Sequence, residues 1–452
     1  MQAFIVYYTE ISRYLIALLI TFYAYEAFTV FRITDEGRQG NIFVRQNILM
    51  LLIHLSCFVS IFFATGEMRY LFFYIMQVIV LLAAIRLFKL LYPLANRLLI
   101  NNMCLLLSIG FAVLTRLSYE RAMRQFFIAT ASLVLAMFVP LVIRRVKLLR
   151  KIRWIYAAVG ITALATVLLF GPLIYGSRRI LTIAGVTFQP SEIVKILFVF
   201  FVAASFFLSV KFSHIIITTA IAAVHVAILA ASRDLGTALI FFVVFVFMVY
   251  LATGKWLYLL AGGVCGSVAA ITAYHLFGHV QVRVQAFLDP WSVIDAQGYQ
   301  ITQSLFSIAN GGLFGLGFYQ GRPSGIPIVE ADFIFSAIAE ELGLIFAVCI
   351  LLVCLSSFVM FMNIAAILND RFYQLIAFGF GIMYIFQIFL AVGGGTRFIP
   401  MTGLTLPFIS YGGSSIFVST IIFAIVASLY IVRADETQRE ERGKRKQDNE
   451  KN

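Results

Sequence analysis

The sequence predicts an all-α protein that crosses a membrane many times. Three observations support this prediction: 62% of the 452 residues are hydrophobic, only 12% are charged, and the apolar residues gather in repeated runs of about 18 or more. Runs of that length cross a bilayer as helices, because hydrocarbon offers exposed backbone groups no hydrogen-bond partners. The net charge of +13 lies largely in short loops and in the tail, so it indicates topology and not nucleic-acid binding.

About thirteen runs have this length, so the predicted architecture is a polytopic helix bundle. They lie near residues 11–31, 47–65, 70–93, 98–115, 125–143, 154–175, 193–210, 214–231, 236–252, 256–277, 333–361, 372–392 and 416–432. The start of the chain lacks the pattern of a cleaved signal peptide, so we expect the first run to remain as an anchor. The cysteines fall inside the runs without disulfide or zinc spacing, which predicts small core residues; they are Cys57, Cys104, Cys265, Cys349 and Cys354.

The basic loop at residues 144–153, RRVKLLRKIR, sets the predicted orientation. It holds six basic residues and no acid, which marks it as cytoplasmic. With thirteen spans, alternation from this loop places the N-terminus outside and the C-terminus in the cytoplasm. Residues 434–452 are densely charged and are predicted to form a disordered cytoplasmic tail.

Arginine dominates the basic residues of the predicted outer face. Its planar guanidinium suits bidentate contact with phosphate oxygens, although any one of these residues would also serve as an ordinary interfacial anchor. As a set beside polar motifs, they favour a phosphorylated lipid as the ligand. The set comprises Arg116, Arg121, Arg124, Arg178, Arg179, Arg233, Arg283, Arg322 and Arg397.

Residues 1–97 contain three of the runs and no polar constellation. They are predicted to form an added N-terminal transmembrane module of unknown purpose. Glu26, His54, Arg86 and Lys89 are the intramembrane or near-terminal ionisable groups of this module, and ionisable groups in a membrane are functional candidates. Arg86 and Lys89 lie close enough to a cytoplasmic end for their charged groups to reach the interface. Residues 98–433 carry the polar motifs, and we expect them to form the functional core.

The motif FQPSEIVK predicts a helix that starts at Pro190. Proline suits the first turn, and the Glu192 carboxylate complements the positive end of the helix dipole. Lys195 follows on the same face, where the two charges can pair. Either this pair belongs to a well-capped helix, or it lines an outer cavity and binds substrate. At the next outer turn, Asp234 is predicted to cap the helix that begins near Leu235 and to support the same cavity.

The stretch at residues 278–332 is the one around which the chain is organised. Loops this long inside compact proteins are usually functional or disordered, and this one is too aromatic and too sparsely charged to be disordered. We expect it to cover a reaction site on the outer face. Within it, QGYQITQSLFSIANGG predicts a short amphipathic helix that groups Gln300, Gln303 and Ser304 on one side. These three residues and Arg283 are candidates for substrate binding.

Asp332 stands between this loop and the next apolar run. A carboxylate directly before a helix suits an N-cap, and a capping aspartate at the mouth of a cavity can also be a general base. Glu340 and Glu341 lie two to three turns deeper. At least one of them needs a buried partner, for which Lys195 is the candidate, and Glu341 is expected to face the cavity.

The last outer loop, at residues 393–415, is rich in glycine and proline. It predicts a rigid re-entrant turn, which is tolerated at membrane depth only beside protein or a polar cavity. A purely structural plug is the alternative. Its candidates for substrate binding and for the cavity wall are Arg397, Ser410, Gly412, Gly413 and Ser414.

Six motifs follow one another at predicted outer membrane edges: FQPSEIVK, DLGTA, LDPW with GYQITQSL, GGLFGLG, DFIFSAIAEELG and LPFISYGGSS. Together they resemble the shape, elongation, division and sporulation (SEDS) family, which includes FtsW, RodA and SpoVE. The resemblance covers about Asn101 to Arg433 and implies a ten-helix core with three additional N-terminal helices. Departures from the family pattern are Glu330-Ala331 in place of His-Thr, Ser232-Arg233 in place of Gln-Pro, and Ile180 in place of tryptophan.

The resemblance implies a peptidoglycan polymerase of the bacterial plasma membrane that uses lipid II and works with a class B penicillin-binding transpeptidase. It also implies that Asp332 is the family's essential aspartate and that Glu192 and Lys195 are its conserved pair.

A polymerase of this kind needs a base for the attacking sugar 4-hydroxyl, and we expect Asp332 to be that base. The departing lipid pyrophosphate needs positive charge, from outer arginines or from a divalent cation such as Mg²⁺ or Mn²⁺. Two alternatives are a transporter that flips lipid II, with Glu341 in its path, and a non-catalytic scaffold for the transpeptidase.

Overall fold

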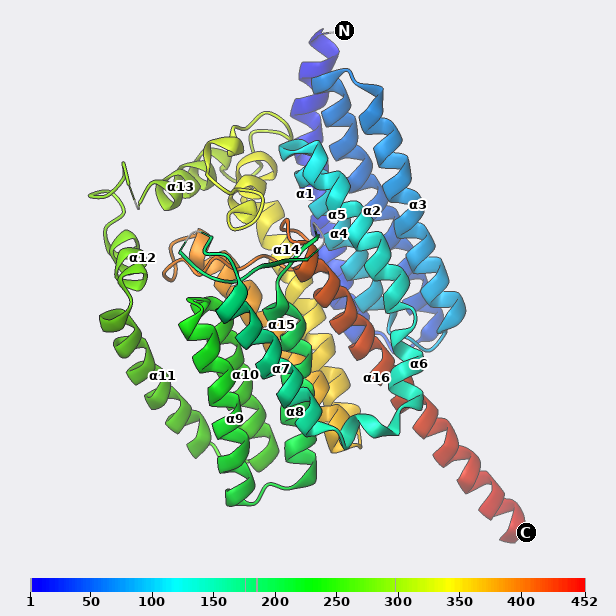
Figure 1. Cartoon of the computed structure of the whole chain (residues 1–452). Coiled ribbons are helices and arrows are strands. Elements are labelled where there is room, and N and C mark those ends of the chain that lie inside the picture. Colours follow the sequence, from blue (N-terminus) through cyan, green and yellow to red (C-terminus); the bar gives the residue numbers. More distant parts are fainter. Residues whose placement is uncertain (1, 175, 184–185, 297, 452) are drawn as a thin grey trace.

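The computed structural model describes residues 2–174, 176–183, 186–296 and 298–451, in which helices joined by loops make up the regular structure apart from one small hairpin and one isolated bridge (Figure 1). Thirteen of its helices are long and apolar enough to cross a membrane. They are α1 (Gln2–Thr29), α2 (Glu36–Thr65), α3 (Met68–Leu91), α4 (Arg97–Leu117), α5 (Tyr119–Ala136), α7 (Arg153–Phe170), α8 (Pro190–Leu208), α9 (Phe212–Ala231), α10 (Leu235–Thr253), α11 (Leu257–Leu276), α14 (Ile334–Ile367), α15 (Arg371–Gly395) and α16 (Gly413–Lys451). The prediction of an all-α polytopic membrane protein is therefore confirmed.

The shorter elements lie between the long helices. They are η1 (Val30–Arg32), α6 (Val139–Arg145), η2 (Lys147–Arg150), α12 (Gly278–Leu288), α13 (Tyr299–Gly311) and η3 (Pro323–Gly325). Strands β1 (Leu181–Ile183) and β2 (Val186–Phe188) pair antiparallel, with Leu181 opposite Phe188. Helices α12 and α13 lie at the end of the bundle from which the N-terminus also projects, and the C-terminus lies at the opposite end (Figure 1).

Local sequence explains where several helices begin. Asp35 caps α2 by accepting a hydrogen bond from the Arg38 N–H, and Pro190 occupies the first turn of α8 as predicted. The Asp234 carboxylate accepts from the Thr237 N–H and caps α10, which confirms the predicted cap.

The three N-terminal helices pack directly against the core. Helix α1 contacts α14, and α2 contacts α4. The Tyr23 hydroxyl on α1 donates to the Asn102 amide oxygen on α4, while the Asn102 amide nitrogen donates to Ser356 and Ser357 on α14. The most hydrophobic stretch of α4 is 100% buried, so α4 is enclosed between the module of residues 1–97 and the remaining helices.

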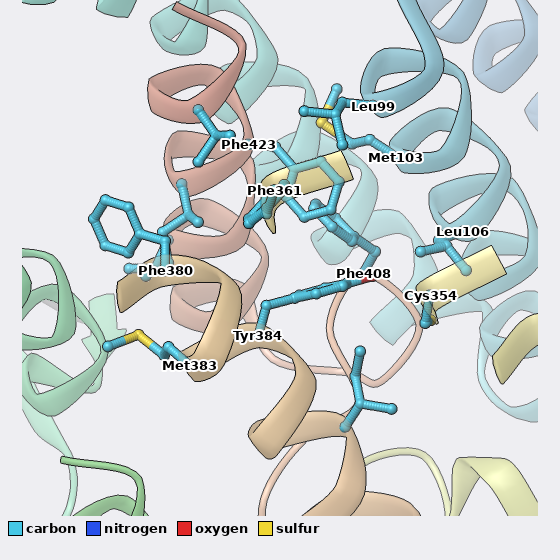
Figure 2. Close-up of a cluster of buried hydrophobic side chains, with 14 of the residues drawn as sticks. Leu99, Met103, Leu106, Cys354, Phe361, Phe380, Met383, Tyr384, Phe408 and Phe423 are labelled. Atoms are coloured by element: carbon cyan, nitrogen blue, oxygen red, sulfur yellow. The ribbon is translucent and has the colours of Figure 1, made fainter. Parts of the chain in front are cut away.

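The last outer loop does enter the helix bundle. Figure 2 shows the Phe408 ring from this loop among Phe361 of α14, Tyr384 of α15 and Phe423 of α16. The Phe408 and Phe423 rings meet edge to face with their centroids 4.8 Å apart. On the other side, the Gly110 position of α4 approaches so closely that an added Cβ would lie 2.6 Å from the Phe408 carbonyl oxygen. The loop is therefore packed as deeply as core residues are.

Helix α14 is interrupted at Gly343, whose φ of 87° and ψ of 166° are not helical. The segment that follows α13 fills this interruption, because the Leu316 N–H donates to the Glu340 carbonyl and the Leu344 N–H donates to the Gly312 carbonyl. Backbone groups released by the break are thus satisfied by the large loop. Glycine is required here, since a Cβ on Gly343 would lie 2.4 Å from the backbone of the facing segment.

Helix α16 continues as far as Lys451, although the sequence predicts a disordered tail over residues 434–452. The difference has a physical basis, because glutamate, glutamine, arginine and lysine all have high helix propensity and follow directly on a spanning helix that is already formed.

Candidate functional site

A cavity of about 700 Å³ opens at the end of the bundle that carries α12 and α13. It is lined by the hairpin region, by α12 and α13, by the residues before α14 and by the last outer loop. The predicted site residues on its wall are Asp332, Arg283, Gln300, Arg397, Gly412, Gly413 and Ser414. The prediction that the stretch at residues 278–332 covers a site is consistent with this arrangement.

The Asp332 carboxylate faces this cavity and is partly exposed to it. Helix α14 begins at Ile334 with Phe333 in the N-cap position, so Asp332 is not the helix cap that the sequence also allows. Among the described residues, no hydrogen bond or ion pair engages its carboxylate. Burial raises the pKa of Asp332 above its ordinary value, and the nearby positive charges of Arg179 and Arg283 oppose that rise.

Two arginines line the cavity, one from the hairpin region and one from α12, and both are held by backbone carbonyls of the last outer loop. The Arg179 guanidinium donates to the Gly403 carbonyl at 3.2 Å, and the Arg283 guanidinium donates to the Met401 carbonyl at 3.2 Å. Burial lowers the pKa of Arg283, and the neighbouring Arg179 charge lowers it further. The two like charges are held near each other, so the site favours an anion between them.

The cavity wall carries more positive than negative charge. Its basic side chains are Arg179, Arg233, Arg283 and Arg397, and its acidic side chain is Asp332. The N-terminus of α16 at Gly413 also opens on the cavity, where backbone N–H groups and the helix dipole favour negative charge. Burial and the charges of three arginines lower the pKa of His279, another wall residue. An anionic ligand such as a phosphate or pyrophosphate fits this wall.

Arg397 lines the cavity, but its guanidinium is also engaged in the protein. It donates to the carbonyl oxygens of Phe287 at 2.8 Å and of Leu288 at 2.9 Å. These carbonyls end α12, and a cation at a helix C-terminus is stabilising. Arg397 therefore fixes α12, which carries Arg283, to the last outer loop.

Asp234 lies behind the cavity wall and organises it. Its carboxylate lies 3.5 Å from the Arg179 guanidinium and accepts from the Ser191 hydroxyl at 3.4 Å and the Gln189 amide at 3.5 Å. Because Asp234 is only 1% exposed, it does not meet a ligand directly. Its position supports the predicted structural role, now with Arg179 as the group that it orients.

The predicted pair of Glu192 and Lys195 is present, with the Lys195 ammonium 2.6 Å from the Glu192 carboxylate. Both side chains are buried and neither lines the cavity, which differs from their prediction as substrate-binding residues. The Lys195 ammonium also donates to the Gln387 amide oxygen, and the Gln387 amide nitrogen donates to the Thr405 carbonyl of the cavity wall. The pair is thus linked through Gln387 to the backbone of the cavity wall and helps to hold it in place.

Helix α13 confirms the predicted short helix, but its polar residues separate. Gln300 lines the cavity, whereas Gln303 does not. The Ser304 hydroxyl is buried against the Ser336 hydroxyl at 2.5 Å and donates to the Gly395 carbonyl at 2.6 Å. These contacts join α13 to α14 and α15, so Ser304 packs helices together and does not face the cavity.

The last outer loop holds the backbone on either side of Asp332 in place. The Ser410 hydroxyl donates to the Ala331 carbonyl at 2.6 Å, and the Tyr411 N–H donates to the Glu330 carbonyl at 2.7 Å. Ser410 is buried and does not line the cavity, so it acts through the backbone. The departure at Glu330 is also accommodated locally, because its carboxylate forms an ion pair with Arg121.

Glu341 has a different partner from the one expected. Its carboxylate lies 3.0 Å from the Arg116 guanidinium, so the expectation of Lys195 is wrong. Arg116 also donates to the Gly321 carbonyl at 3.0 Å and lies over the Tyr319 ring. Glu341 is 2% exposed and is not on the cavity wall. The Glu341 carboxylate therefore holds Arg116, which in turn attaches the large loop to α4 and α14.

Several polar cavity residues are absent from the predicted site, among them Arg179, Gln189 and His279. Arg179 belongs to the set of outer arginines, but only the fold shows that it meets Asp332. Gln189 belongs to the motif FQPSEIVK, although it is not among the predicted site residues, and His279 reaches the wall from α12 without a local signal.

The carboxylates of the site do not form a metal centre by themselves. Among the described residues, no group of three or more His, Cys, Asp or Glu side chains could hold a metal ion. Asp332 stands beside arginines, which disfavour a cation. The charged wall residues that would meet an anionic ligand are therefore the arginines.

Comparison with known proteins gives consistent results. The family model of cell cycle proteins named for FtsW, RodA and SpoVE matches residues 94–434. Peptidoglycan glycosyltransferase RodA of Mycobacterium tuberculosis (strain H37Rv) is 36% identical over 271 residues, which are 56% of this chain and 58% of that protein. Probable peptidoglycan glycosyltransferase FtsW of Aliivibrio salmonicida is 32% identical over 359 residues, which are 74% of this chain and 85% of that protein. The chain therefore spans little more than half the length of the mycobacterial RodA relatives.

Solved structures share the fold. A chain from a peptidoglycan synthase complex that coordinates polymerization and crosslinking aligns with a TM-score of 0.63 and 24% identity, covering 75% of this chain and 98% of that one. The rod shape determining protein RodA of Thermus thermophilus aligns with a TM-score of 0.57 and 22% identity, covering 74% of this chain and 96% of that one.

Proposed function

The chain belongs to the FtsW, RodA and SpoVE family of cell cycle proteins, and on this basis we propose that it is a peptidoglycan glycosyltransferase that polymerises lipid II into glycan strands. The observation that carries the proposal is the unpaired Asp332 carboxylate in a cavity whose other charged wall residues are arginines. A reaction that moves a proton beside a pyrophosphate needs both features.

In the proposed reaction, the 4-hydroxyl oxygen of one lipid-linked sugar bonds to the anomeric carbon of another. The bond from that carbon to the lipid pyrophosphate breaks, and the electron pair leaves with the phosphate oxygen. Asp332 takes the hydroxyl proton, for which its raised pKa makes it a better base than an ordinary aspartate. Arg179 and Arg283 stabilise the charge that develops on the pyrophosphate.

The surrounding parts have proposed places in this scheme. Residues 98–433 form the polymerase core, residues 278–332 form its outer loop, and residues 1–97 form an added module. The cavity faces the extracytoplasmic side of a bacterial plasma membrane, and the C-terminus lies in the cytoplasm, as the positive-inside rule indicates. A class B penicillin-binding protein is the proposed partner that crosslinks the new strands.

Purified protein in detergent tests the proposal with lipid II as the sole substrate. Wild-type protein is expected to produce glycan polymer, and Asp332→Ala protein with unchanged thermal unfolding is expected to produce none. Full polymer yield from the Asp332→Ala protein would refute the role of Asp332.

A transport assay separates the alternative functions. If wild-type protein moves labelled lipid II across vesicles but never polymerises it, the protein is a transporter. If it does neither while cells tolerate Asp332→Asn, the protein is a scaffold.

A further inference from the structure

A second cavity, of about 290 Å³, lies where α2, α3 and α4 meet at the other end of the added module. The start of α2, the end of α3 and the start of α4 form its wall, so the cavity lies at one end of these helices. The Tyr92 hydroxyl beside it donates to the Met137 carbonyl near the end of α5, so the cavity lies on the side of the basic loop at residues 144–153. It is remote from Asp332 and plays no part in the proposed reaction.

The wall of this cavity is cationic. Lys89 and Arg97 line it, and none of the wall residues is acidic. Among the described residues, neither side chain has a hydrogen bond or an ion pair. Arg97 also begins α4, where the positive end of the helix dipole repels a cation. Lys89 is exposed and Arg97 is partly exposed, so both cations are accessible to an anion from outside the protein.

Neutral polar side chains also line this second cavity. Asn41, Asn47 and Asn101 line the same cavity. The Asn47 amide oxygen is buried and has no hydrogen-bond partner. Buried polar atoms in proteins are normally paired, so this amide suits a hydroxyl group supplied by a ligand.

The exposed surface next to the cavity is apolar. Val44 lines the cavity, and Ile48, Leu52 and Leu55 follow it along the same face of α2. Each of these four side chains is at least 40% exposed. A ligand with an anionic head and an apolar chain would therefore meet matching surfaces on both parts.

We propose that this cavity binds the headgroup of an anionic phospholipid, with the phosphate between Lys89 and Arg97 and an acyl chain along α2. Basic pockets between spanning helices on the cytoplasmic side recognise such headgroups. The bound lipid would join the added module to α4, the first helix of the region matched by the family model.

Full-length protein in phosphatidylcholine nanodiscs, titrated with fluorescent phosphatidylglycerol, tests this proposal. The double variant Lys89→Gln/Arg97→Gln is expected to weaken binding about 10- to 30-fold, because each phosphate contact contributes several-fold to affinity. The matched control is Arg38→Gln/Arg86→Gln, which removes two exposed charges from α2 and α3 at positions outside the cavity. Equal weakening in both double variants would overturn the proposal, because general surface charge would explain it.

A third variant keeps every charge. Gly40 lines the cavity, and a Cβ there meets nothing within 4 Å, so Gly40→Leu is expected to fold and to obstruct the headgroup. Undiminished binding by Gly40→Leu would contradict the assignment. Inorganic phosphate and fluorescent phosphatidylcholine serve as competing probes. Complete displacement by millimolar phosphate, or equal binding of phosphatidylcholine, would show that an anionic phospholipid is not the ligand.

Discussion

Two carboxylates near the start of α14 have contrasting surroundings: Asp332 just before the helix and Glu341 within it. Asp332 faces the 700 Å³ cavity and makes no described polar contact through its carboxylate. Glu341 is enclosed and lies 3.0 Å from Arg116. Both acids are close to the large outer loop, yet one has spare bonding capacity and the other has none. The contrast shows that a charged group with a full set of protein partners stabilises the fold, whereas one without them remains available for chemistry.

The largest expected effect comes from neutralising each acid in turn. Asp332→Asn should reduce polymer formation by about 10²- to 10⁴-fold, the usual contribution of a general base, and should leave stability unchanged because no contact is lost. Glu341→Gln should do the reverse, with a lower Tm and nearly normal turnover per folded molecule. Initial rates with lipid II and thermal unfolding in detergent measure both quantities. Equal profiles for the two variants would remove the distinction between the acids.

Removal of the partner of Glu341 should have the next largest effect. Arg116→Met leaves a buried carboxylate without its cation, which costs about 3–5 kcal/mol of unfolding free energy. The double variant Arg116→Met/Glu341→Leu should recover most of that loss, because no lone charge remains. Denaturant unfolding of the wild type, Arg116→Met, Glu341→Leu and the double variant gives the coupling energy. An additive double variant would mean that the ion pair does not hold the loop.

A smaller effect is expected at the arginine beside Asp332. Arg283→Gln should raise KM for lipid II about tenfold, as loss of a charged contact does. Since Arg283 lowers the pKa of Asp332, its removal should raise that pKa. The base works only when it is deprotonated, so the acid limb of the pH–rate profile should move to higher pH. An unmoved limb with altered KM would indicate that Arg283 binds substrate without influencing Asp332.

The smallest effect is expected at the ion pair of Arg121 and Glu330. Arg121 is half exposed, and exposed pairs contribute about 0.2–1 kcal/mol. Arg121→Gln should therefore shift Tm slightly and change polymer yield less than twofold. A large loss of activity would instead link Glu330 to the position of Asp332.

The spanning helices were predictable because their apolar length is a property of contiguous sequence. The helix start at Pro190, the cap at Asp234 and the pair of Glu192 and Lys195 were predictable for a similar reason. Each depends on neighbours within one helix turn. The resemblance to a family supplied the proposed role of Asp332, and its placement in the cavity supports that role.

Contacts between distant segments were not predictable. The partner of Glu341 is Arg116, 225 positions away, and no local pattern distinguishes it from Lys195. The periodicity of α13 likewise groups Ser304 with Gln300, but only Gln300 lines the cavity, because Ser304 packs against Ser336 of α14. Arg397 was expected to meet substrate, and only the fold shows that its guanidinium also holds the end of α12.

Because α4 is enclosed, its polar side chains are kept away from the lipid of the membrane. Asn101 and Asn102 lie in the first turns of α4 and form hydrogen bonds with α2 and α1 respectively. If α1–α3 were cut away, the Asn101 amide nitrogen and the Asn102 amide oxygen would lose these partners, and unsatisfied polar groups in a membrane are costly. The first three helices therefore shield α4 from lipid and supply hydrogen-bond partners for its amides. In a truncated chain that starts at Arg97, lipids or other proteins would have to replace them.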